Sequence, residues 1–240
     1  MIEIYDDNGD KLLSVAGESL VGQNLANAYL RGAQLAGMDL SGANLRDANL
    51  NEANLQNASL AQADLTGTNL RKANLVSANL SHAAFGDGTD LSNAKFHGAV
   101  LDGTWLSSQH FPDGTDVEWQ DVSFVGACLV GLSFRQLRGA NFSNARIQYC
   151  NLSGADLRDT DFTGSKIEYT LLKRARFNDR TRGLNPLRFI QVTPGLLVAA
   201  LLGFLLGWQM WNVGWMGAGF LLALPLTTLG QLVQLRYFPD

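Results

Sequence analysis

Residues 43–60 of this 240-residue chain read ANLRDANLNEANLQNASL, a unit of five residues that repeats without a break. The same step places a large apolar residue at every fifth position from Leu20 to Phe85, usually with Ala two positions before it. Neither an α-helix, with 3.6 residues per turn, nor a strand, with a period of two, keeps every fifth residue on one side. A chain that turns a corner every five residues keeps every fifth residue on the inner side. Four such segments close a square coil with Ala and Leu facing inward.

The period shifts three times before it ends at Phe177. One residue is added at Gly86-Asp87-Gly88, and a larger break, residues 107–117, contains the turn signature Pro112-Asp113-Gly114. A final shift of three residues separates Phe134 from Leu137. The in-phase positions number 31, which predicts between seven and eight stacked coils.

The outward positions are rich in Asn, Asp, Ser and Gly, and these residues suit a corner at every repeat. Asx side chains bond their own backbone in turns, and stacked coils place Asn over Asn, which allows side-chain ladders. Two alternating segments, residues 2–5 and 11–15, flank Asn8-Gly9 and predict a β-hairpin. We expect this hairpin to cap the exposed edge of the first coil.

The repeated Ala-Asn-Leu units resemble the pentapeptide-repeat family, whose consensus is A-(D/N)-L-x-x. The resemblance covers residues 20–177 and implies a mainly β protein, a right-handed quadrilateral parallel β-helix of about seven to eight coils. Together with the flanking segments it predicts four parts: a hairpin cap at 1–16, the β-helix at 17–178, a basic linker at 179–188, and two transmembrane helices at 189–238.

The helical hairpin is predicted from 47 consecutive residues, 189–235, without Asp, Glu, Lys or Arg. A membrane span needs about 20 apolar residues, so this stretch holds two spans and a turn at 211–214. Six residues are the expected interfacial anchors: Arg188, Trp208, Trp211, Trp215, Arg236 and Tyr237. Basic residues flank the outer ends and the turn has none, so the positive-inside rule places the β-helix and the C-terminus on the cytoplasmic side. The alternative is a buried helical hairpin that caps a soluble homodimer.

Charge is distributed unevenly along the chain. Residues 1–134 carry 16 acidic and 6 basic side chains, a balance of −10, whereas residues 135–188 carry 5 acidic and 11 basic ones, a balance of +6. The basic cluster next to the expected spans could contact anionic lipid headgroups. The acidic half is the feature that would support imitation of DNA.

No catalytic motif, metal ligand set or cofactor-binding loop is recognisable, and we expect neither an enzyme nor a bound cofactor. His82, His97 and His110 are assigned to outward positions without metal-ligand spacing. Cys150 takes the small inward position that Ala fills elsewhere and is expected in the core. No signal peptide is visible at the N-terminus, which predicts a cytosolic location for the repeats.

The irregular loop at 107–121 is the candidate interaction site. It combines His110, Phe111 and Trp119, with Trp105 just before it, and loops on rigid scaffolds often carry function. The alternative is a tolerated insertion whose aromatic side chains tuck beneath the loop and plug the shifted coil.

These features predict a membrane-anchored, non-catalytic protein–protein interaction scaffold, bound to lipid through its two C-terminal helices and to an unidentified protein partner. Two alternatives remain open. Some members of the family resemble a DNA duplex and inhibit topoisomerases such as gyrase, and others could be accessory or assembly subunits recognised through the helical hairpin. A nucleic-acid partner is not expected.

Overall fold

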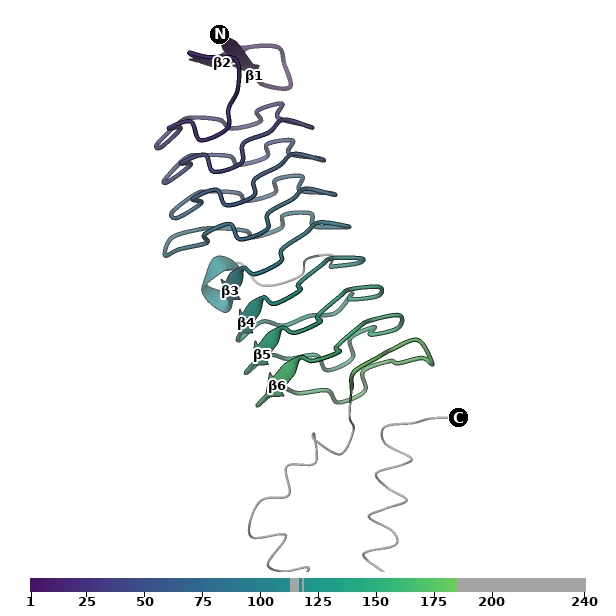
Figure 1. The fold of residues 1–240 in the computed structure, drawn as a ribbon. Helices are drawn as coiled ribbons and strands as arrows, with labels where there is room; N and C mark the ends of the chain where they lie inside the picture. The colour runs from purple at the N-terminus through teal and green to yellow at the C-terminus, as the bar shows by residue number, and fades with distance from the viewer. Residues whose placement is uncertain (113–116, 118, 185–240) are drawn as a thin grey trace, which may run out of the picture. The chain divides into compact units, whose positions relative to one another are not determined.

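The computed structural model describes residues 1–112, 117 and 119–184, and residues 1–184 form one compact unit. The chain forms a hairpin followed by coils stacked along one axis, with short strands aligned on one side (Figure 1). The named elements are β1 (Ile2–Tyr5), β2 (Lys11–Val15), β3 (Trp105–Ser107), the 3-10 helix η1 (Ser108–His110), β4 (Cys128–Val130), β5 (Arg146–Gln148) and β6 (Lys166–Glu168).

Successive coils pair through parallel backbone bridges about twenty residues apart, as between Asn49 and Asn69. The Leu50 N–H donates to the Asn69 carbonyl at 2.8 Å, and the Asn69 N–H donates to the Ala48 carbonyl at 3.0 Å. The same pair of bonds recurs on each side of the coil, so the backbone polar groups of the sides are satisfied by the neighbouring coils.

Each side contributes one large inward residue per coil, and we number the sides in the order in which the chain enters them. The inward residues are Leu20, Leu40, Leu60, Leu80, Leu101, Phe124, Phe142 and Phe162 on the first side; Leu25, Leu45, Leu65, Phe85, Leu106, Leu129, Ile147 and Ile167 on the second; Leu30, Leu50, Leu70, Leu91, Phe111, Phe134, Leu152 and Leu172 on the third; and Leu35, Leu55, Leu75, Phe96, Trp119, Leu137, Leu157 and Phe177 on the fourth. The predicted inward positions of Leu and Ala are confirmed.

The corners use a left-handed backbone at the second residue after each inward position. Asn27 and Asn57 have φ of 59° and 57°, and Gly42, with φ of 65°, takes the same place in another coil. Asn side chains reinforce these turns, since the Asn49 Oδ1 accepts the Asn51 N–H at 3.1 Å. The predicted ladder is also present, because the Asn44 Nδ2 donates to the Asn24 Oδ1 at 3.0 Å.

The predicted N-terminal hairpin is present and pairs with the coil. β1 and β2 are antiparallel, with Ile2 opposite Val15, and Ile4 is fully buried. The Tyr5 carbonyl accepts the Gln34 N–H at 2.8 Å. One coil later the equivalent bond joins Asn54 to Ala33, so β1 takes the place of a preceding coil at this edge.

The larger break is shorter than the sequence predicted and begins only after Phe111. The Leu91 N–H donates to the His110 carbonyl at 2.7 Å, which places Phe111 beneath Leu91 as the next inward residue of the third side. The step from Leu106 to Phe111 is therefore a regular five residues, with η1 in place of the usual turn. Three extra residues fall between Phe111 and Trp119, and with Phe111 included the stack holds eight coils.

The next coil omits two residues at the same corner, since Phe134 and Leu137 are three residues apart where the regular step is five. Accordingly, the bridge from Val100 to Ser123 spans 23 residues and the following one, from Ser123 to Asn141, spans 18. The three added and two omitted residues both fall at this corner, and parallel bridges continue on the sides below it to the last coil.

The expected helices at 189–238 lie outside the described residues. Nowhere in the described ranges is there a helix with the length and apolar character that a bilayer crossing requires.

Candidate interaction surface

The structure separates the four residues of the predicted interaction loop. Trp105 keeps 43% of its surface exposed, whereas His110 and Trp119 are fully buried and Phe111 is 3% exposed. These three side chains are not on an exposed loop surface, and the alternative, in which the aromatics plug the shifted coil, describes their positions. Trp119 takes the inward position at which the period of five resumes.

His110 is buried because η1 turns the chain inward at a position that would otherwise face solvent. Its Nδ1 accepts the Ser107 N–H at 3.1 Å, and its ring meets Trp105 edge-on at 5.3 Å between centroids. Burial lowers the pKa of His110, and the Gly86 carbonyl and Asp87 partly oppose that shift. The assignment of His110 to an outward position is therefore wrong, while His82 and His97 are exposed as predicted.

Trp119 lies at the centre of an aromatic core. Its ring stacks on Phe96 at 4.8 Å and meets Phe111 and Phe134 edge-on, each at 5.6 Å. Below it Phe124, Phe142 and Phe162 stack in sequence, with centroids 5.1 and 4.9 Å apart. These rings are structural and offer no surface to a partner.

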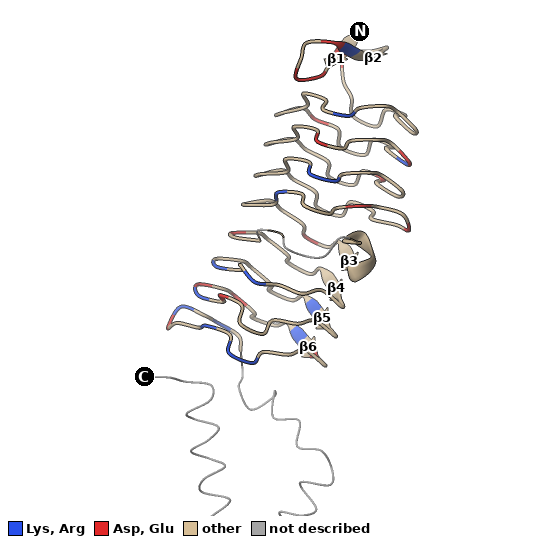
Figure 2. Ribbon diagram, turned by 180° about the vertical axis from the view of Figure 1, so that it is seen from behind, with Lys and Arg blue, Asp and Glu red and all other residues tan. Residues whose placement is uncertain are grey.

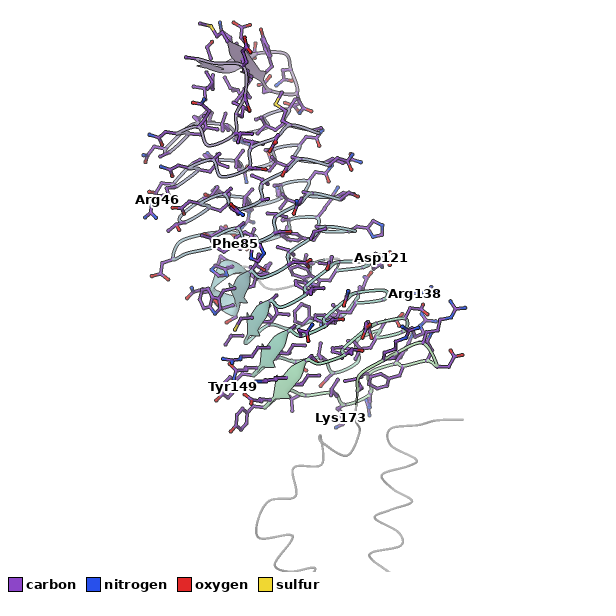
Figure 3. The ribbon with its side chains drawn as sticks, in the orientation of Figure 1. Arg46, Phe85, Asp121, Arg138, Tyr149 and Lys173 are labelled. Atoms are coloured by element: carbon purple, nitrogen blue, oxygen red, sulfur yellow. The ribbon has the colours of Figure 1, made fainter. Side chains whose placement is uncertain are left out.

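Three exposed aromatic residues, Trp105, Tyr149 and Tyr169, lie instead on and beside the parallel sheet β3-β4-β5-β6 on the second side. Its register aligns Trp105, Cys128, Arg146 and Lys166 in one outward column. At the adjoining corner Tyr149 and Tyr169 stack face to face, 5.0 Å apart at 7°, and each is 62% exposed. Tyr149 lies at the outer edge of the coil beside these strands (Figure 3). We call the sheet and this corner the β3–β6 face.

The two tyrosines occupy a backbone conformation that disfavours them. Tyr149 and Tyr169 have φ of 54° and 50°, the left-handed corner position that Gly, Asn or Asp fills most often in the stack. A left-handed residue other than Gly costs roughly 1–2 kcal/mol, and Asn tolerates it better than an aromatic residue does. Their mutual stacking offsets part of that cost, about 0.5–1.5 kcal/mol. Bulky residues kept at strained, exposed positions are candidates for a functional role.

Sequence reasoning did not single out Tyr149 and Tyr169. The sequence signal that could have found them is their spacing: both take the outward corner position and lie twenty residues apart, the length of one coil, so they stack in neighbouring coils. Trp105 was identified correctly as an outward residue.

Both cysteines are free. Cys150 is 1% exposed in the Ala position, and burial raises the pKa of its thiol to about 11, so the predicted core role is confirmed. Cys128 is half-buried on the β3–β6 face. In the part of the chain that the structure describes, no cluster of His, Cys, Asp or Glu is arranged to hold a metal ion.

The acidic excess of residues 1–134 lies mainly outside the coils. Of the 16 acidic residues, five precede Leu20 and three fall within 113–118, which leaves eight in the described coils against five basic residues. Several of these pair: Glu52 bonds both Arg31 and Lys72, at 3.0 and 3.3 Å, and Asp64 bonds Arg46 at 3.2 Å. The described coils therefore form no continuous acidic column of the kind that a DNA-like surface needs (Figure 2).

The family model described as pentapeptide repeats matches residues 24–60, 48–87 and 140–179. The coils at residues 24–87 and 140–179 are thus similar to pentapeptide repeats. No curated protein matches the sequence. The expected resemblance to pentapeptide repeats is confirmed for residues 24–87 and 140–179. The expected interfacial anchors lie outside the described residues: Arg188, Trp208, Trp211, Trp215, Arg236 and Tyr237.

Solved structures of pentapeptide-repeat proteins are similar to the chain. HetL, involved in heterocyst differentiation regulation in the cyanobacterium Nostoc sp. strain PCC 7120, is 26% identical over 64% of this chain and 73% of its own, with a TM-score of 0.29. QnrB1, a plasmid-mediated fluoroquinolone resistance protein, is 17% identical over 65% and 77%, with a TM-score of 0.39. A protein of the Arabidopsis thaliana thylakoid lumen is 24% identical over 53% and 66%, with a TM-score of 0.22.

Proposed function

We propose that this pentapeptide-repeat protein is a membrane-anchored, non-catalytic scaffold that presents its coils on the cytoplasmic side of a bilayer and binds a protein partner through the β3–β6 face. The pair Tyr149 and Tyr169 is the observation that supports protein binding. The proposed anchor rests on the uncharged stretch 189–235 and its flanking basic residues.

The β3–β6 face combines the features of a protein-binding surface. Tyr, Trp and Arg dominate the energetics of protein interfaces, because large rigid side chains bury much area with little loss of conformational entropy. Here Trp105, Tyr149 and Tyr169 stand beside Arg146 on a backbone held by parallel pairing from β3 to β6. A face that is ordered before binding loses little entropy when a partner docks.

Cross-linking in intact membranes, followed by affinity purification of the full-length chain, tests the protein-binding part. The double variant Tyr149→Asn/Tyr169→Asn removes both rings while keeping a residue that accepts the left-handed corner. The matched control is Tyr29→Asn, since Tyr29 is also 62% exposed and Asn49 fills the same position in the next coil. We expect the double variant to lose a cross-linked partner that the wild type and the control retain. Equal partner recovery from all three would refute this use of the face.

Membrane fractionation tests the anchor separately. We expect the full chain to stay with the membrane after a wash in alkaline carbonate, and a chain that is released would lack the proposed anchor. Exchange of residues 189–238 for an unrelated two-span hairpin then separates a scaffold from a subunit recognised through its helices. Partner recovery should survive the exchange in a scaffold.

A further inference from the structure

We propose that the last coil meets anionic lipid headgroups end-on, through a ring of cationic side chains that surrounds the coil axis. The inference rests on the proposed function in one respect: the bilayer is the one to which the chain is anchored. We call these six residues the basic ring: Lys166, Lys173, Arg174, Arg176, Arg180 and Arg182.

The basic excess of the C-terminal half is concentrated in one coil. Residues 162–182 carry the six cations of the basic ring against two carboxylates, Glu168 and Asp179. The coil before it, residues 142–161, holds Arg146 and Arg158 against three aspartates. In Figure 2 the Lys and Arg colouring is densest on the lowest coils. The positive charge thus forms a layer across the stack, and no cationic stripe runs along it.

The ring residues are distributed around the coil axis. Lys166 lies on the second side in β6, and Lys173 and Arg174 follow Leu172 at the corner between the third and fourth sides. The backbone of Arg176 forms a parallel β-bridge with Asp156 on the fourth side, and that of Arg182 forms one with Asp161 on the first side. Lys173 lies on the last coil in Figure 3.

The basic ring is exposed and little neutralised. All six residues are exposed, and within residues 1–112, 117 and 119–184 the only ion pair of the ring joins Arg180 to Asp159 at 3.9 Å. Asp156 and Asp161 stand one coil behind Arg176 and Arg182. The hydrogen bond from Arg158 lowers the pKa of Asp156 and that from Thr163 lowers the pKa of Asp161, with a smaller contribution from Arg176 and Arg182. In the upper coils, by contrast, Glu52 forms ion pairs with both Arg31 and Lys72.

The shape of the charged layer determines which surface it fits. One coil is about 4.8 Å thick, and charges interact across roughly 8–10 Å at physiological salt. A flat anionic surface perpendicular to the coil axis therefore lies within reach of all six cations, whereas a surface parallel to the axis reaches those of one side. Anionic headgroups attract each basic residue near the bilayer surface. A bilayer is such a plane, and a DNA duplex, being a cylinder, would reach only part of the ring.

In the sequence, the basic ring comes directly before the expected anchor. Leu184 is the last described residue, and the first expected span begins at Phe189.

Fluorescence energy transfer from the full-length protein to dye-labelled lipid tests the orientation. A donor is attached at Asn8→Cys, in the hairpin turn, or at Thr163→Cys, in the last coil, both in a Cys128→Ser background where Cys150 is buried. The vesicles contain phosphatidylcholine alone or mixed with phosphatidylglycerol. On the anionic vesicles we expect position 8 to be farther from the bilayer than position 163 by the height of the stack, roughly 35 Å. That difference should shrink on the neutral vesicles and at high salt.

A matched pair of variants isolates the basic ring. Lys166→Gln/Lys173→Gln/Arg174→Gln should reduce the distance difference on anionic vesicles to its value on neutral ones. Lys72→Gln/Lys95→Gln/Arg46→Gln removes the same residue types from the upper coils and should leave it unchanged. Equal distances for positions 8 and 163 on anionic vesicles, or equal effects of the two variants, would overturn the proposal.

Two further outcomes are distinguishable. Release of the protein from neutral vesicles by carbonate, with salt-sensitive binding to anionic vesicles that the ring variant loses, would reject the anchor and support the lipid contact. Binding of a DNA duplex that only the ring variant loses, with no effect of that variant on vesicles, would assign the ring to nucleic acid and overturn the lipid contact.

Discussion

The indole ring of Trp119 stacks on the phenyl ring of Phe96, one coil above it, with 4.8 Å between centroids and 13° between planes. This contact joins the coils on either side of the three-residue insertion. It keeps the fourth side in register where the length of the coil changes. The upper coils achieve the same packing with Leu over Leu, as at Leu55 and Leu75, because their length is constant.

Removal of the Trp119 ring should destabilise the stack more than any exposed aromatic does. Trp119→Ala leaves a large cavity among Phe96, Phe111 and Phe134, and truncation of a buried Trp costs about 3–5 kcal/mol. Trp105→Ala, at a 43% exposed position, should cost under about 1.5 kcal/mol. Urea unfolding followed by far-ultraviolet circular dichroism compares the two variants, and similar midpoints would contradict the central role of Trp119.

A methyl group at Gly183 should detach the end of the last coil. A Cβ there would lie 2.2 Å from the Phe162 carbonyl carbon, whereas at Gly42, with a similar positive φ, it would meet nothing within 4 Å. Gly42→Ala therefore has only the conformational penalty, about 1 kcal/mol, and Gly183→Ala adds a backbone clash. We expect the Phe162 N–H, bonded to the Arg182 carbonyl at 2.9 Å, to exchange faster in Gly183→Ala alone. Unchanged protection would show that the coil end adapts.

The two thiols should differ in reactivity. Cys128 is half-buried and should react with Ellman's reagent at pH 8 in the native protein, whereas Cys150 should react only after unfolding in urea. Burial raises the pKa of Cys150 from 9.0 to about 11, so its thiolate is scarce at that pH. A native Cys128→Ser variant should show no fast thiol. A fast reaction in that variant would mean that Cys150 is accessible.

The same shift predicts a dependence of stability on alkaline pH. The folded state keeps the Cys150 thiol protonated to a higher pH than the unfolded chain does. The contribution of this thiol to the free energy of unfolding is therefore full below pH 9 and is lost as pH rises from about 9 to about 11. Cys150→Ala places the usual repeat residue in the position and should lose less stability across that interval. Parallel stability curves for the two proteins would contradict the assignment.

Acid should loosen the corner at η1. Burial lowers the pKa of His110 below 6.5, so the folded state resists protonation and loses stability as pH falls from 6.5 through that lower value. The protonated ring has no acceptor for the Ser107 N–H, which now donates to its Nδ1. Hydrogen exchange of a peptide covering residues 105–111, corrected for intrinsic rates, should increase below pH 6.5. His110→Gln should remove that increase, and an identical increase in the variant would exclude His110 as its cause.

The period of five was sufficient to predict the coils because every side obeys the same constraint. Ala and Leu fit the interior, and Asn or Gly fits the left-handed corner at each turn. The hairpin was equally local, since Asn8-Gly9 lies between two short alternating segments. Phe111 and His110 were misplaced because the residues around them do not match the repeat unit, since η1 replaces the usual corner. The regular step becomes visible only through the hydrogen bond from the Leu91 N–H to the His110 carbonyl.

The sequence by itself determined the four-sided coil, its inward Leu, Phe and Ala, the core position of Cys150, and the hairpin that precedes the first coil. These features depend on neighbours within five residues, so the order of residues specifies them directly. Only the tertiary structure decided which residues from different coils share a surface. Stacking at about 4.8 Å brings Tyr149 onto Tyr169, aligns Trp105 with β4 to β6, and gathers the C-terminal cations into one layer. The physical reason is register: three residues added in one coil and two omitted in the next, at the same corner, set which residues meet.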